Sequence, residues 1–193
     1  MTKRVCVYCA SSSQVDDKYK MAARRLGEIL SENNIGCNYG GGAIGLMGEL
    51  AQSMVDHHGD ITGIIPRFMV ERDWDNPLVK EIETPDMHSR KERMVQDVDA
   101  AIALPGGCGT LEELLEIITW KQLGLFLKPI IILNVDHYFD PLVAMLDKCV
   151  EENFMSAQLK KTWTVVSSAE EVLPAIQQAH GWEEADSHKY ASL

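Results

Sequence analysis

Residues 104–113 decide how this chain is organised; they read Leu104-Pro105-Gly106-Gly107-Cys108-Gly109-Thr110-Leu111-Glu112-Glu113. The apolar run at 100–104 is typical of a buried parallel strand. After the glycines, apolar residues recur at helical spacing, so the chain passes from a strand through a glycine turn into a helix. Glycines let the backbone turn tightly and approach a ligand closely. The free N–H groups at the start of the helix then form an anion site that suits phosphate.

Residues 110–113 also match a second pattern, the capping box. In that interpretation Thr110 caps the helix and Glu113 reaches back to it, so both side chains are purely structural. A capping box does not require the Pro-Gly-Gly-x-Gly sequence that precedes it here. The glycines therefore favour a ligand site, and Glu113, one helical turn in, could face the same ligand.

Length and composition predict one globular domain. With 193 residues, 46% of them hydrophobic, the chain is long enough for one sizeable core. We expect a nucleotide-binding α/β domain at 1–180 and a polar, frayed tail at 181–193. No apolar run reaches membrane-spanning length, and the N-terminus is not a signal peptide. The five cysteines are an odd number, which favours reduced thiols in the cytoplasm. Cys6 and Cys9 should lie on opposite faces of a strand, so we expect no metal site.

The charge of the chain limits its partners. A net charge of −11 argues against nonspecific binding to nucleic acid or to a membrane surface. A phosphate ligand then needs cations gathered locally, and the densest basic cluster is Arg90, Lys91 and Arg93. They fall on a predicted helix at 87–97, with Lys91 inside its apolar stripe and Arg90 at the edge. The alternative is a solvated face whose long stems pass over the methionines.

Strand and helix patterns alternate along nearly the whole chain. Strands are predicted at 4–8, 36–39, 60–65, 79–83, 100–104, 129–133 and 163–166. Helices are predicted between them, with Asp140 as the cap of one and Ser168 as the cap of the last, at 169–180. This alternation predicts a three-layer α/β/α sandwich with a mainly parallel sheet. Ligands bind such sheets beyond the carboxyl ends of the strands, where the glycine turns lie.

A second glycine turn, Gly40–Gly45, fits the G-x-G-x-x-G pattern of dinucleotide sites. The match is weak, because the turn follows the second strand and the acid about 20 residues on, Asp60, precedes its strand instead of ending it. The glycines, Gly41 and Gly42 among them, serve equally well to admit a mononucleotide. An NAD(P)-dependent oxidoreductase and a noncatalytic nucleotide-binding protein are therefore the alternatives to an enzyme that acts on a nucleotide.

Two motifs resemble those of the "lonely guy" family: P-G-G-x-G-T-x-x-E at 105–113 and M-H-x-R-K at 87–91. The resemblance runs from about Val5 to Val172. It implies a Rossmann-like homodimer that hydrolyses the N-glycosidic bond of nucleoside 5′-monophosphates. The implied substrates are cytokinin riboside monophosphates, often with AMP as well, and the implied products are the free base and ribose 5-phosphate. Members are often labelled lysine decarboxylases, but no feature of the sequence supports a pyridoxal-phosphate lysine, and no cofactor is expected.

The resemblance also assigns roles to residues. Arg90 and Glu113 match the family's catalytic pair, and the phosphate-binding turn falls on Gly106, Gly107, Gly109 and Thr110. Further substrate contacts are expected at Gly41, Gly42, Asp73, Lys91, Glu112 and Thr119, with Glu71 as the alternative to Asp73. Substituting Glu113 by Gln or Arg90 by Ala should abolish base release while the fold survives. Whether Glu113 is nucleophile, base or electrostatic stabiliser stays open, as does the choice of base.

Overall fold

The computed structural model describes residues 2–179, 181–183 and 186. Its centre is a seven-stranded sheet in the order β4-β3-β2-β1-β5-β6-β7, in which every neighbouring pair is parallel. The strands are β1 (Arg4–Tyr8), β2 (Gly36–Tyr39), β3 (Ile61–Pro66), β4 (Lys80–Thr84), β5 (Ala100–Ala103), β6 (Ile130–Leu133) and β7 (Thr164–Val166). The predicted parallel sheet is confirmed.

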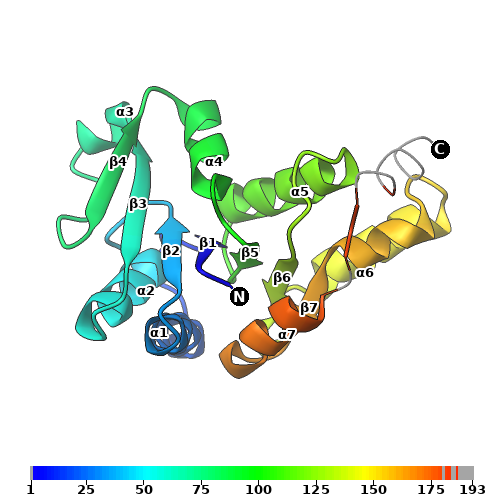
Figure 1. Cartoon of the computed structure of the whole chain (residues 1–193), viewed down its shortest axis with the longest axis horizontal. Coiled ribbons are helices and arrows are strands. Elements are labelled where there is room, and N and C mark those ends of the chain that lie inside the picture. Colours follow the sequence, from blue (N-terminus) through cyan, green and yellow to red (C-terminus); the bar gives the residue numbers. More distant parts are fainter. Residues whose placement is uncertain (1, 180, 184–185, 187–193) are drawn as a thin grey trace.

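Helices cover both faces of the sheet (Figure 1). On one face lie α1 (Asp17–Glu32), α2 (Gly45–Asp56) and α7 (Val172–Gln178). On the other lie α4 (Met87–Val95), α5 (Cys108–Gln122) and α6 (Asp140–Glu151). The remaining helices are short: α3 (Arg67–Val70) and the 3-10 turns η1 (Val135–His137), η2 (Ala157–Thr162) and η3 (Ala169–Glu171). The predicted three-layer sandwich is therefore the observed fold.

The central strand shows how the sequence builds two cores. Side chains alternate across a strand, so Val5 and Val7 enter the core under α1 and α2, while Cys6 and Tyr8 enter the core under α4 and α5. Cys9 belongs to the first core and Cys6 to the second, as the spacing predicts.

Several predicted boundaries are wrong. Helix α5 begins at Cys108 with Gly107 as its N-cap, so Thr110 lies inside the helix and does not cap it. Asp140 is the first residue of α6 and not its cap; its carboxylate accepts a hydrogen bond from Asn134 Nδ2 at 2.7 Å. The predicted last helix divides into η3 and α7.

The C-terminal end of the chain is described in part. His180, the predicted end of the last helix, lies outside the described residues, as does most of the tail predicted at 181–193. Trp182, which is described, is buried.

The order of the strands positions the site. β1 is the central strand, with β2 on one side and β5 on the other, so the chain winds outward from β1 in two directions. Crevices in α/β sheets form beyond the carboxyl ends of the strands at such a switch point. No helix within the described ranges is long and apolar enough to cross a membrane.

Candidate active site

A cleft of about 620 Å³ opens at this switch point. Its floor is the carboxyl end of β1 and the residues after it. Its walls are the turn after β2, the segment after β3, one face of α4 and the start of α5. Residues that line it include Tyr8, Gly40, Gly42, Ile44, Met47, Met69, Asp73, Trp74, Met87, Arg90, Met94, Gly107, Gly109, Thr110 and Glu113.

Arg90 and Glu113 meet inside the cleft. Arg90 comes from α4 and Glu113 from α5, and both side chains are buried. Arg90 Nη1 lies 3.5 Å from Glu113 Oε1. The other guanidinium nitrogens donate to backbone carbonyls, Nε to Ile64 O at 3.0 Å and Nη2 to Gly40 O at 2.9 Å. The strands therefore fix the guanidinium, which presents one remaining edge to the carboxylate.

Burial dominates the electrostatics of Glu113. Loss of hydration disfavours the charged carboxylate and raises the pKa of Glu113. The attraction of Arg90 lowers the pKa but is the smaller effect, so the pKa is about 7. Glu112 and Glu116 raise this pKa further, while Lys91 lowers it. A carboxyl group poised near neutral pH in a cleft is the kind of group that performs acid–base or electrostatic catalysis.

The glycine-rich start of α5 is open where a ligand would bind. A Cβ added at Gly107 or Gly109 would meet no protein atom within 4 Å, so the fold itself does not require glycine there. Both residues line the cleft, with Thr110 beside them. Together with the free N–H groups at the start of a 15-residue helix, this opening suits an anion.

Gly106 has a different role, because the protein needs it. A Cβ on Gly106 would lie 2.1 Å from Thr110 Oγ1. The carbonyl oxygen of Gly106 accepts a hydrogen bond from Tyr138 Oη at 2.6 Å. Gly106 thus sets the shape of the turn and does not line the cleft.

The other glycine turn is filled by the protein's own atoms. A Cβ on Gly45 would lie 2.5 Å from Ser12 O, and one on Gly40 would lie 2.4 Å from Arg90 Nη2. Gly41 has a positive φ of 79° and packs on Ile65; it does not line the cleft, whereas Gly42 does. Gly40, Gly41 and Gly45 therefore allow close packing of the chain, which is not the use that a dinucleotide site makes of its glycines, whereas Gly42 faces the cleft.

The remaining predicted residues lie in different places. Asp73 lines the cleft, and Glu71 does not. Lys91 and Glu112 pair with each other at 2.6 Å outside the cleft lining, and Lys91 also contacts Glu116 at 2.9 Å. Thr119 is exposed and donates to Leu115 O within its own helix.

Sequence reasoning missed several residues of the site, among them Trp74 and Tyr138. Trp74 lines the cleft, and its only sequence signal is an indole within a run of charged residues in a predicted loop. Tyr138 holds the turn at Gly106 from 32 residues away, and no local pattern indicates it.

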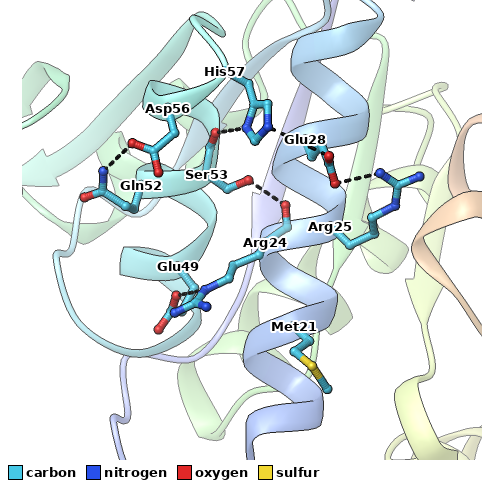
Figure 2. Close-up of a pocket in the computed structure, with 9 residues that line it drawn as sticks. All are labelled: Met21, Arg24, Arg25, Glu28, Glu49, Gln52, Ser53, Asp56 and His57. Carbon is cyan, nitrogen blue, oxygen red and sulfur yellow. Dashed lines mark hydrogen bonds and ion pairs between the residues drawn. The ribbon is translucent and has the colours of Figure 1, made fainter.

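A second groove, of about 530 Å³, lies between α1 and α2 (Figure 2). Its two arginines are already paired: Arg24 with Glu49, and Arg25 with Glu28 at 2.6 Å. His57 Nδ1 lies 2.8 Å from Ser53 O. Ion pairs within the protein therefore occupy the charged groups of the groove, and the cleft at the switch point is the better ligand site.

The fold and the cleft define the class: a Rossmann-like α/β protein with a buried acid–guanidinium pair beside an open helix start. A family model described as "Possible lysine decarboxylase" matches residues 47–176. The chain is 43% identical over 179 residues to the Arabidopsis thaliana cytokinin riboside 5′-monophosphate phosphoribohydrolase LOG7, covering 91% of this chain and 82% of that protein. It is 44% identical over 177 residues to LOG3 of the same plant, with the same coverage. The chain belongs to this LOG family.

Solved structures share the fold. The molybdenum cofactor binding protein of Rippkaea orientalis superposes with a TM-score of 0.70 at 22% identity, over 92% of this chain and 96% of that one. The molybdenum cofactor carrier protein of Chlamydomonas reinhardtii superposes with a TM-score of 0.68 at 16% identity, over 93% and 98%. At this identity the likeness shows the architecture alone.

Proposed function

We propose that this protein hydrolyses the N-glycosidic bond of nucleoside 5′-monophosphates and releases the free base and ribose 5-phosphate. Its substrates are cytokinin riboside 5′-monophosphates and AMP. The observation that carries the proposal is the buried Arg90–Glu113 pair. It lies in the same cleft as the open glycines at the start of α5. The named activity of relatives at 43–44% identity supports the same reaction.

The substrate's phosphate binds at the start of α5. Gly107 and Gly109 leave space there, and the backbone N–H groups of the first turn donate to the phosphate oxygens. Glu113 lies further along the same helix, so a bound phosphate places the ribose across its carboxylate. The base then extends toward the turn that contains Gly42, on the far side of the cleft.

In the reaction, the bond between C1′ of the ribose and the base nitrogen breaks and its electron pair leaves with the base, which takes up a proton. The oxygen of a water molecule bonds to C1′ and loses a proton. Positive charge builds on the sugar ring as the base leaves, and ionised Glu113 stabilises it, as carboxylates do in glycoside hydrolysis. Arg90 holds that carboxylate in place. A preorganised contact of this kind lowers a barrier by roughly 3 kcal/mol.

Lysine decarboxylation, named in the family model, does not fit the cleft. Pyridoxal-phosphate chemistry needs a lysine that forms a Schiff base with the cofactor. Among the described residues that line the cleft there is no lysine. The basic residue that lines it, Arg90, is bound to two carbonyls and a carboxylate.

We also propose that residues 1–180 act as one nucleotide-binding domain, and that the protein works as a cytoplasmic homodimer. The resemblance of its motifs to the "lonely guy" family supports the dimer. The free cysteines of the described chain are compatible with a reducing compartment. Light scattering at micromolar concentration should give twice the chain's 21.6 kDa; a mass of one chain contradicts the dimer.

The test of the reaction is product analysis. AMP and isopentenyladenosine monophosphate are each incubated with the protein, and bases and ribose 5-phosphate are separated by chromatography. Equal amounts of base and ribose 5-phosphate are expected. Tight binding of AMP without turnover identifies a noncatalytic nucleotide-binding protein, and oxidation of NADH without base release identifies an oxidoreductase.

A further inference from the structure

The segment at 67–76, between β3 and β4, forms one wall of the cleft and is here called the flap. It contains α3, and three of its residues that line the cleft are consecutive: Asp73, Trp74 and Asp75. An antiparallel bridge between Asp75 and Gly42 ties the flap to the turn after β2. The flap therefore belongs to the end of the cleft where the base is expected.

Trp74 is an exposed indole within this wall. Its side chain is 52% exposed although it lines the cleft. The guanidinium of Arg72 lies 5.3 Å from the centre of the indole ring and 5.6 Å from the ring of Phe68. Arg72 holds the ring by a cation–π contact, and about half of the side chain stays exposed at the cleft, where a ligand could reach it.

The position of Trp74 relative to α5 suits a base. The flap follows β3 and the phosphate turn follows β5, and β2 and β1 lie between them in the sheet. Three interstrand spacings amount to ~14 Å, a gap that a phosphate, a ribose and a base together bridge. The apolar side chains of Ile44, Met47 and Met69 line the cleft together with the flap and give a base an apolar surface beside the carboxylates of Asp73 and Asp75.

We infer that Trp74 is a stacking platform for the purine base of the substrate. The inference rests on the proposed function, since it takes the phosphate to be bound at α5. Indole and purine are both flat and bicyclic, and they overlap more fully than an indole and a pyrimidine. Stacking on an aromatic side chain gives base affinity without reading hydrogen bonds, so it also admits purines with an apolar substituent.

The experiment compares a ligand that has a base with one that has none. Affinities for AMP and for ribose 5-phosphate are measured by calorimetry in protein that also carries Glu113→Gln, so that AMP is not consumed. Adding Trp74→Ala should weaken AMP binding about tenfold and leave ribose 5-phosphate binding unchanged. Trp74→Phe should restore most of the AMP affinity. Phe68→Ala is the matched control, because Phe68 also contacts Arg72 but does not line the cleft.

If the role of Trp74 were purely structural, Trp74→Ala would weaken the binding of AMP and of ribose 5-phosphate alike. Either that result or an unchanged AMP affinity in Trp74→Ala overturns the inference. Indole fluorescence gives a second readout: AMP should quench emission in protein that retains Trp74 and not in Trp74→Phe. Failure of the proposed function is distinguishable, because protein with Glu113 intact would then release no adenine from AMP while the Trp74-dependent binding persists.

Discussion

Glu113 is placed where its charge is costly to the fold. The pKa of about 7 in the folded protein lies above its ordinary value of 4.5, so the folded state binds a proton more tightly than the unfolded chain does. The stability that this proton confers is present below pH 4.5 and is lost as the pH rises through 7. At higher pH the ionised carboxylate therefore destabilises the protein, by up to about 3 kcal/mol.

Glu113→Gln should abolish base release and at the same time stabilise the protein at pH 8, because the amide fills the site without a buried charge. Chemical denaturation at pH 8 and at pH 5 measures this, and the gain should shrink at pH 5. Glu116→Gln, one turn further along α5, is the matched control and should leave activity within a few fold. Normal turnover by the Glu113 variant removes the mechanism.

The pH dependence of kcat/KM should follow the same carboxyl group. Because the ionised form is needed, kcat/KM should fall tenfold per pH unit below about 7, the pKa of Glu113. A pH–rate profile with AMP between pH 5 and 9 measures it. The substrate phosphate has a pKa of about 6. A profile that bends only at the pKa of the phosphate, or does not bend at all, contradicts the assignment of the pH dependence to Glu113.

At the scale of elements, the glycines at the start of α5 have two different roles: Gly107 and Gly109 leave space for a ligand, and Gly106 is needed by the fold. Gly107→Ala should raise KM about tenfold, because its Cβ meets no protein atom but enters the phosphate's space. It should lower the melting temperature only slightly, because alanine is a poorer N-cap than glycine. Gly106→Ala should lower the melting temperature, since its Cβ meets Thr110 Oγ1 at 2.1 Å. Thermal melts and initial rates of both variants check this. A Gly107→Ala variant with unchanged KM argues against phosphate at this turn.

Lys91 links α4 to α5 next to the Arg90–Glu113 pair. It bonds to Glu112 at 2.6 Å and Glu116 at 2.9 Å, outside the cleft lining, so we expect it to act as a positioning residue. Lys91→Met should lower kcat several fold with KM within twofold, and lower the free energy of unfolding by about 1–2 kcal/mol. Arg93→Met, on the same helix and bonded to Gln96, is the control for these kinetic and denaturation measurements. A rise in KM with unchanged kcat would instead indicate contact with the substrate.

The elements themselves were largely predictable, because most strands are short apolar runs, although β4 (Lys80–Thr84) is mainly polar, and the long helices have an apolar face. The start of α5 was not. Gly109 is a poor helix former, so propensity places the start after it, at Thr110, whereas the helix begins at Cys108. Lys91 shows a second limit of prediction from the sequence. Its place in an apolar stripe was visible in the sequence, but its partners lie on another helix, and no local pattern names them.

At the scale of the whole molecule, the alternating pattern predicts a parallel sheet but not the order of its strands. That order decides which loops meet, and it brings the flap at 67–76 opposite the start of α5. The motifs predicted that Arg90 and Glu113 act together, and the structure places them in contact. Contacts such as Tyr138 with Gly106 depend on packing between distant elements and have no periodicity to reveal them.

A ligand that bridges the cleft should stabilise the entire fold, because the cleft walls come from both halves of the sheet. AMP at one hundred times its dissociation constant should stabilise the Glu113→Gln protein by about 2.7 kcal/mol. Differential scanning calorimetry measures the rise in melting temperature, with NADH as the comparison ligand. An equal or larger shift with NADH supports the oxidoreductase alternative.

The guanidinium of Arg90 also satisfies two carbonyls, at Ile64 and Gly40, at the ends of neighbouring strands. Removing it would take these two hydrogen bonds away, so a descendant that had given up hydrolysis would still gain stability from keeping the arginine. Glu113 does not stabilise the fold in this way, and its ionised carboxylate lowers the free energy of unfolding as the pH rises through 7. In a survey of sequences with this architecture, the glutamate is therefore the more informative marker of hydrolysis, because the arginine has a structural role as well.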